Sequence, residues 1–469
     1  MSAPDARRRL VAGVLLVLLA VAALRDLARL DGALPWRTMV DFPDFYCAGR
    51  ALDRGANPYT YEPLHSCERR VNVGNAFRAA LFADNATLAV PAPLPPYDLL
   101  PFKEIARMPV GEARLLDAIA IAASVLVCAA FLAALGVSFW LAAAALAFPA
   151  GYIELNTGQI VPFALLLLVL CGWALARRHD PLAGVLAVCT WVEPIAGLPV
   201  TLAVLFFVPR ARWAAGVTAA AVALLALSVG GEDLLRQYVT RVVPAQAASE
   251  LHFPFQYSLS YALAHFGMAS GAARSIGEIS YLLLLFAGLM LASRAARRQR
   301  RRELLVFVPA LCCVLGGAYL HAEELALAVP ALLVFSVQAR GTARIACAAA
   351  LCGLAVPWIL VWGEKQLFLA SLFVCAVILL QMELRTRAAV TLFVLIAAAI
   401  YALELHPPHL PVPTTSAKRY SPNALVEDEW REYAERRGTT DPLWFAIKIP
   451  AWSALLAGVA LAARAGART

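Results

Sequence analysis

The sequence predicts an all-α polytopic membrane protein, and its composition and hydrophobic runs are the observations that predict this class. Of its 469 residues, 61% are hydrophobic and only 15% are charged, whereas soluble domains carry about 25% charged residues. A single soluble core stops growing near ~250–300 residues, so one soluble domain cannot bury this excess of apolar residues. The composition therefore excludes a soluble enzyme, a disordered chain and a fibrous repeat.

Apolar runs long enough to cross a bilayer recur along the chain. A spanning helix needs about 20 mostly apolar residues, and about twelve segments approach this requirement. The expected spans are 9–25, 115–135, 137–153, 159–176, 213–230, 278–296, 303–320, 323–338, 342–361, 366–382, 387–404 and 444–463. Because residues 1–25 have a basic start but no small-residue cleavage site, we interpret them as a retained first transmembrane helix.

Arginine clusters separate these runs and predict the topology. The net charge of +8 would favour nucleic acid in a soluble chain. Here the basic residues flank hydrophobic runs, and Lys and Arg collect on the cytoplasmic side of membrane helices. Placing every cluster inside gives both termini a cytoplasmic location, with no nucleic-acid partner. The clusters are Arg7–Arg9, Arg177/Arg178, Arg210/Arg212, Arg294 through Arg302, Arg340/Arg344, Arg385/Arg387 and Arg464/Arg468.

The apolar segment 182–208 does not fit a simple span. Arginine clusters place both of its ends on the same side, and Glu193-Pro194 interrupts its centre. We expect a re-entrant or broken hairpin of two helices, with Glu193 buried against protein or water. A single tilted helix with a proline kink is the alternative.

Polar stretches divide the chain into alternating membrane and outer segments. We expect 1–25 as the first transmembrane helix, 26–114 as a catalytic first outer loop with short helices, 115–230 as transmembrane helices, 231–277 as an outer loop, 278–404 as transmembrane helices, 405–443 as an outer loop and 444–469 as the last helix with a cytoplasmic tail. Connections as long as these are usually functional or disordered. Helical patterns within the first outer stretch predict a small extracytoplasmic cap.

Two of the ten cysteines, Cys47 and Cys67, fall in the first outer loop, and the other eight lie in apolar membrane segments. Outside a bacterial inner membrane, a disulfide between them would persist; two unpaired thiols are the alternative. No CxxC spacing or Cys/His cluster of metal type occurs, so we expect no structural zinc site and assign no metal ligand among the site residues.

Short polar clusters near the expected extracytoplasmic boundary of the membrane are the candidates for catalytic and substrate-binding residues. A carboxylate at Asp41, just after the first span, is placed to accept a proton from a hydroxyl. Asp44 lies three residues later, where it would also cap a helix over Phe45–Arg54. Between later spans, the amides of Asn156 and Gln159 suit sugar hydroxyls because they both donate and accept hydrogen bonds.

A further boundary cluster contains His321, Glu323 and Glu324. His321 is a candidate to bind a phosphate or a substrate hydroxyl, and Glu324 is a candidate to orient a sugar. Solvated turn residues are the alternative interpretation of this cluster. We expect the polar clusters to share one cavity on the outer face.

Several short motifs occur in order along the chain. They are 41–52 (DFPDFYCAGRAL), 55–59 (GANPY), 155–159 (LNTGQ), 182–185 (LAGV), 257–259 (YSL) and 321–325 (HAEEL). Together they resemble glycosyltransferase family 87, whose first outer loop carries a pattern close to D-F-x-x-Y-Y-x-A-G-R-A-L…G-x-D-P-Y. The resemblance extends over roughly residues 40–335. The chain departs from the family at Glu193, where a lysine is usual, and at Glu324, where aspartate is common.

This resemblance implies a GT-C membrane fold and an inverting hexosyltransferase, often a mannosyltransferase, without a cofactor. The donor would be a polyprenyl-phosphate sugar and the acceptor a glycolipid or glycan, with membrane lipid around the protein in a bacterial inner membrane. By resemblance Asp41 is the base on the extracytoplasmic face, and His321 lies in a companion loop. The motif also implies substrate contacts for Tyr46 and Tyr59. Arg50, Lys365 and His321 are candidates to support the leaving phosphate.

Two other function classes compete with this interpretation. A lipid or solute transporter would also use a broken hairpin with a buried Glu193, but the sequence shows no internal repeat. A non-catalytic subunit of envelope assembly would use the outer loops only to dock partners.

Overall fold

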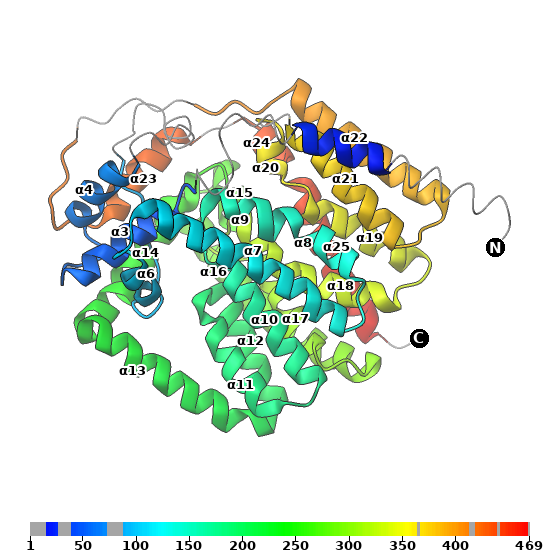
Figure 1. The fold of residues 1–469 in the computed structure, drawn as a ribbon, viewed down its shortest axis with the longest axis horizontal. Helices are drawn as coiled ribbons and strands as arrows, with labels where there is room; N and C mark the ends of the chain where they lie inside the picture. The colour runs from blue at the N-terminus through cyan, green and yellow to red at the C-terminus, as the bar shows by residue number, and fades with distance from the viewer. Residues whose placement is uncertain are drawn as a thin grey trace.

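The computed structural model describes residues 16–26, 39–72, 88–363, 366–411, 418–438 and 441–467. Across this part of the chain the secondary structure is helical, and one isolated antiparallel bridge joins Thr60 to Leu425. The all-α class is therefore confirmed. Figure 1 shows a bundle of helices with a group of shorter helices gathered at its left end.

The helices form a bundle and a smaller group that we call the cap. The cap contains α3 (Phe42–Asp53), α4 (Tyr61–Val71), α6 (Leu99–Ile105), α14 (Val243–Ser249) and α23 (Val426–Arg437). The bundle contains α7 (Val110–Ala134), α8 (Phe139–Leu146), α9 (Ile153–Thr157), α10 (Val161–Ala176), α11 (Asp180–Cys189), α12 (Pro194–Phe207), α13 (Arg212–Gln237), α15 (Leu259–His265), α16 (Ser270–Gln299), α17 (Leu304–Val314), α18 (Val329–Gln338), α19 (Thr342–Ala355), α20 (Trp358–Val361), α21 (Gln366–Gln381), α22 (Thr386–Leu405), α24 (Leu443–Ala446) and α25 (Ile449–Gly466). Short 3-10 or π segments, among them η1 (Ala147–Tyr152), η5 (Glu250–His252) and η6 (Glu323–Ala328), connect several of these helices.

Five helical stretches of the described chain are long and apolar enough to cross a membrane. They are Val110–Ala134, Pro209–His252, Ser270–Gln299, Thr386–Leu405 and Leu443–Gly466. Six further apolar helices are shorter, with 10–17 residues each. The chain is thus a multi-pass membrane protein, whereas the expected number of about twelve full spans stays a prediction. Of the expected first span, 9–15 lie outside the described residues and 16–26 are helical.

The long helices expose apolar side chains rather than burying them. Leu224 on α13 is 67% exposed, Leu283 on α16 is 64% exposed and Leu395 on α22 is 61% exposed. Apolar surface of this extent is not stable against water, so these faces fit the acyl chains of a bilayer. In Figure 1, α13 stands apart along the lower left edge and α22 runs along the upper right, which leaves both faces open.

The segment 231–277, which we expect as an outer loop, is largely helical in the structure. α13 continues to Gln237 across a kink at Gly230 and Gly231, and further helical turns follow as far as His252. Gly231 adopts a φ of 72°, a left-handed conformation that glycine tolerates and that redirects the chain. This polar helical extension carries the chain from the bundle into the cap.

The apolar segment with Glu193 at its centre forms two helices. α11 and α12 pack against each other, and the backbone of Glu193 between them is extended, with φ −125° and ψ 102°. The Glu193 side chain caps α12 by accepting a hydrogen bond from Ile195 N–H at 3.4 Å. Pro194 then begins α12, a position at which proline loses no helical hydrogen bond.

Inside the cap, a disulfide and a close helix contact fix α3. Cys47 on α3 and Cys67 on α4 form a disulfide that closes a loop with a sequence separation of 20, a length that stabilises a fold by about 3 kcal/mol. α3 also lies against α6 so closely that a Cβ on Gly49 would come within 2.3 Å of the Phe102 carbonyl carbon. These contacts hold the helix whose first residues face the bundle.

Candidate active site

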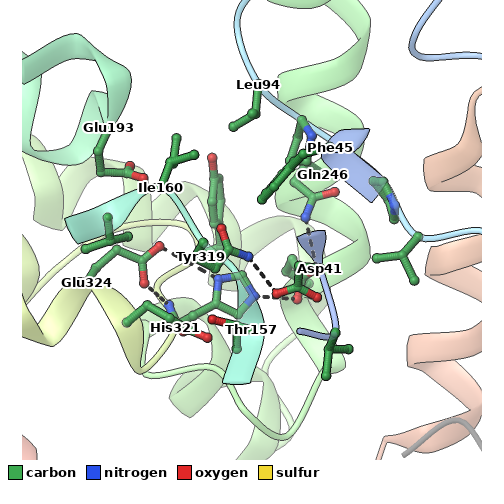
Figure 2. Close-up of a pocket in the computed structure, with 18 of the residues that line it drawn as sticks. Asp41, Phe45, Leu94, Thr157, Ile160, Glu193, Gln246, Tyr319, His321 and Glu324 are labelled. Atoms are coloured by element: carbon green, nitrogen blue, oxygen red, sulfur yellow. Dashed lines mark hydrogen bonds and ion pairs between the residues drawn. The ribbon is translucent and has the colours of Figure 1, made fainter. Parts of the chain in front are cut away.

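A cavity of about 1430 Å³, its open mouth included, lies between the cap and the bundle. Phe45 of α3 and Trp430 of α23 line it from the cap, whereas Val161 of α10 and Leu360 of α20 line it from the bundle. Figure 2 shows Asp41 pointing into the same space as His321 and Glu324, which lie together in a much later segment. The structure therefore brings together polar residues that lie far apart in the sequence.

Asp41 is held at this cavity through both its backbone and its side chain. Its N–H donates to the Thr157 carbonyl oxygen at 2.8 Å, and Val40 N–H donates to the Asn156 carbonyl oxygen at 2.9 Å. Gln159 Nε2 donates to Asp41 Oδ2 at 2.7 Å. The aspartate is half-buried, so its carboxylate is oriented and still reachable from the cavity.

Gly158 permits the close approach between α9 and the start of α3. It ends α9 in a left-handed conformation with φ 77°, which is the usual helix-ending role of glycine. A Cβ on Gly158 would come within 2.6 Å of the Phe42 Cβ. Only a residue without a side chain thus lets Asp41 sit beside Gln159.

His321 faces a glutamate that the surrounding side chains hold firmly. Its Nε2 lies 3.2 Å from Glu250 Oε2. Trp430 Nε1 and Gln246 Nε2 donate to Glu250 Oε1 at 2.6 and 3.0 Å, and Gln256 Nε2 donates to Oε2 at 2.9 Å. Glu250 is 2% exposed, and this set of donors compensates for its removal from water.

Glu324 approaches His321 from the other side. Its Oε2 accepts a hydrogen bond from the His321 backbone N–H at 2.7 Å, and its Oε1 lies 3.8 Å from the ring Nδ1. Burial lowers the pKa of His321, but the carboxylates of Glu250 and Glu324 outweigh burial and raise that pKa well above its ordinary value. Without a ligand, the imidazole therefore carries a proton and a positive charge between two carboxylates.

Acidic side chains dominate the electrostatics of the cavity. Glu193 and Glu323 line it together with Asp41, Glu250 and Glu324. Glu154 lies fully buried in α9 close to this group. Of the residues that the structure describes, no lysine or arginine lines the cavity.

Five of the expected site residues line this one cavity: Asp41, Asn156, Gln159, His321 and Glu324. Lys365 lies outside the described residues. The expected helix start at Phe45 is wrong, because α3 begins at Phe42 and Asp41 occupies its N-cap position. Pro43 in the first turn favours this earlier start.

The remaining expected substrate contacts support the cap instead of lining the cavity. Tyr46 donates its hydroxyl hydrogen to the Met108 carbonyl oxygen at 2.8 Å, and the Tyr59 hydroxyl donates to the Leu94 carbonyl oxygen at 2.7 Å. Asp44 is fully buried within α3, and Arg50 lies in the last turn of that helix, where a cation is favourable. None of these four residues lines the cavity, and their roles as substrate contacts stay predictions.

Two residues that line the cavity, Glu250 and Trp430, could not be identified from the sequence. Both lie in polar stretches without a recognisable motif, and Trp430 is 180 residues from the glutamate that it contacts. Glu323 had one available signal, since it lies between His321 and a second glutamate.

The fold and the cavity agree with a match to a known family. Residues 94–321 match a family model. This match and the helical membrane fold indicate a membrane glycosyltransferase. The match does not favour the transporter alternative. The matching model is that of glycosyltransferase family 87, a family of the GT-C type. Among curated proteins and solved structures, nothing matches the chain.

The matched segment covers part of the cavity. It contains Gln159, Glu250 and His321, whereas Asp41 precedes it and Glu324 follows it. The role of Asp41 therefore depends on its position in the cavity and on the motif in the first outer stretch.

Proposed function

We propose that this glycosyltransferase moves a hexose, specifically mannose, from a polyprenyl-phosphate donor to an extracytoplasmic glycolipid or glycan. The observation that carries the proposal is the half-buried Asp41 carboxylate, which Gln159 holds at the cavity. The match to the family 87 model supports the reaction class, and the motif resemblance supports the donor and the inverting course.

In the proposed reaction, Asp41 accepts the proton of an acceptor hydroxyl as that oxygen attacks the anomeric carbon. The bond between this carbon and the phosphate oxygen breaks, and polyprenyl phosphate leaves with the bonding electrons. Attack from the face opposite the phosphate inverts the anomeric carbon. The leaving group is already a stable anion, so it needs electrostatic support near His321 rather than a general acid.

The apolar part of the cavity wall supports a lipid-linked donor. Ile359 and Leu360 of α20 line the cavity together with Ile160 and Val161 at the start of α10. A polyprenyl chain would pack against such side chains while its phosphate stays at the polar end. The amide of Asn156 lies at that polar end, where it would bind sugar hydroxyls.

We further propose that the protein lies in a bacterial inner membrane with both termini in the cytoplasm. The arginine clusters between the apolar segments support this orientation. It places the cap, and with it the cavity, on the extracytoplasmic face.

The choice of donor tests the proposed function. Purified protein in liposomes would receive radiolabelled polyprenyl-phosphate mannose or GDP-mannose, together with a bacterial envelope lipid extract as acceptor. We expect labelled product from the lipid-linked donor and none from the nucleotide sugar. Transfer from GDP-mannose, or no transfer from the lipid donor, would contradict the proposal.

A further inference from the structure

The proposed site has a charge problem, because its donor is anionic and its lining is acidic. The cavity is lined by the carboxylates of Asp41, Glu193, Glu250, Glu323 and Glu324. Among the described residues, His321 is the basic side chain of this lining. A phosphate entering such a cavity is repelled unless positive charge is added.

We propose that His321, Glu323 and Glu324 bind a divalent metal cation. One donor atom from each of these residues lies within 4.8 Å of the others. Because metal–oxygen bonds are about 2.0–2.6 Å long, two ligands on opposite sides of one ion lie about 4–5 Å apart. The three side chains therefore need little movement to share an ion.

The contacts of the imidazole fit a metal ligand. Nδ1 of His321 and Oε1 of Glu324 are 3.8 Å apart, which is too long for a hydrogen bond and suitable for two ligands on the same ion. The other ring nitrogen, Nε2, lies 3.2 Å from Glu250 Oε2. A metal-binding histidine characteristically donates its second N–H to a carboxylate, which leaves the first nitrogen for the metal.

Buried oxygen atoms without partners supply an independent observation. Glu323 is 9% exposed, and its Oε2 has no hydrogen-bond partner in the described structure although the residue lines the cavity. Glu154 is fully buried nearby, and neither of its oxygens has a partner among the described residues. An unpaired buried carboxylate is costly, and a cation bound at Glu323 would compensate for it.

The chemistry of the three ligands selects the class of ion. Carboxylates favour hard cations such as Mg²⁺ and Mn²⁺, whereas imidazole favours first-row transition metals. Mn²⁺ satisfies both preferences. Its use in catalysis rests on the proposed function: an ion here would hold the donor phosphate and stabilise the charge on the leaving group.

Mn²⁺ binding to the purified full-length protein in detergent tests the site without any transfer assay. Electron paramagnetic resonance would follow free Mn²⁺ during titration of wild type, Glu323→Gln and Glu324→Gln, with Glu427→Gln as the matched control. Glu427 is a buried glutamate of α23 that does not line the cavity. We expect about one ion per wild-type chain, and binding weakened at least about tenfold when either ligand is changed.

A second measurement keeps the result interpretable if a variant is unstable. Thermal unfolding with Mn²⁺ and with EDTA should show a metal-dependent rise in Tm for wild type and Glu427→Gln, and a smaller rise for the ligand variants. No saturable Mn²⁺ binding to wild type, or equal affinity in all four proteins, would overturn the metal site. Mn²⁺ binding without mannose transfer would leave the metal site standing and reject the proposed function.

Discussion

Gln159 controls the direction in which Asp41 points, since its amide donates to Oδ2 at 2.7 Å. The substitution Gln159→Leu removes this donor and keeps a side chain of similar volume. We expect kcat for transfer to fall about 10- to 100-fold with little change in KM for the donor, because a misaligned base affects the reaction more than binding. Steady-state kinetics in liposomes measures both constants. A rise in KM with kcat unchanged would show that Gln159 contacts substrate instead of positioning Asp41.

A second residue-scale prediction concerns Gly158. Its positive φ opposes a side chain, and so does the short distance of 2.6 Å that would separate an added Cβ from the Phe42 Cβ. We expect Gly158→Ala to lower stability by about 2–4 kcal/mol and to reduce transfer, since α3 must shift. Gly55 is the matched control, because it also has a positive φ but nothing lies within 4 Å of its Cβ position.

Thermal unfolding compares the two glycine variants. Gly55→Ala should show only the backbone cost, about 1 kcal/mol, and should keep full transfer activity. Equal losses in both variants would indicate that close packing at Phe42 contributes nothing.

Single residues also show which members of the cavity lining can be predicted from the sequence. Asp41, Gln159 and His321 were identified because each is polar at an expected membrane boundary. Tyr46 and Tyr59 belong to the same motif as Asp41, yet their hydroxyls bind cap carbonyls. A motif reveals which residues occur together, whereas helical geometry decides which of them face the cavity. Glu250 was missed because the residues that place it at the cavity, His321 and Trp430, are 71 and 180 residues away in the sequence.

At the scale of elements, the cap helix α23 buries an acidic residue in its first turn. Glu427 in its first turn is 1% exposed, and neither carboxylate oxygen has a hydrogen-bond partner among the described residues. Burial raises the pKa of Glu427 to about 8. Because this pKa is higher in the folded than in the unfolded state, the folded state is favoured at low pH and weakened as pH rises toward about 8.

Glu427→Gln should therefore stabilise the folded state above neutral pH by about 1–3 kcal/mol, since the amide carries no charge to bury. We expect the Tm of wild type to fall between pH 5 and pH 9 more steeply than the Tm of the variant. Thermal unfolding of both proteins across this range measures the difference. Parallel pH profiles would contradict a buried, titrating Glu427.

Element boundaries were harder to predict than element types. α13 runs beyond the expected end of its span because polar residues after Gly231 continue the helix outside the apolar run. The apolar segment around Glu193 was expected as two helices, since an acidic residue followed by proline interrupts it, and it has this form in the structure. Hydropathy marks where a helix enters lipid, and it does not mark where the helix ends.

At the scale of the whole molecule, composition predicted a helical membrane protein but not its number of spans. Several interior helices, such as α17 and α18, have fewer than 18 residues. A short or broken helix is tolerated at membrane depth when surrounding protein satisfies its backbone. The 20-residue rule applies best to helices that face lipid, such as α13 and α22, and therefore cannot count the others.

The cap completes the molecule, because segments from early, middle and late parts of the chain meet there. α3, α14 and α23 are far apart in the sequence, yet Asp41, Gln246 and Trp430 from these regions line one cavity with the bundle. A transferase that joins a membrane-embedded donor to an acceptor from the aqueous side needs a site at this kind of junction. Figure 1 shows the three helices gathered at the same end of the bundle.

The rate of mannose transfer by Asp41→Asn tests the role of this junction most directly. The variant would be compared in liposomes with wild type and with Asp53→Asn, a more exposed aspartate at the end of the same helix. Because a general base contributes about 10²–10⁴-fold, we expect Asp41→Asn to lose transfer by that factor while Asp53→Asn stays near wild type. Thermal unfolding would confirm that all three proteins are folded. Equal incorporation of label by Asp41→Asn and wild type would show that this carboxylate is not the base.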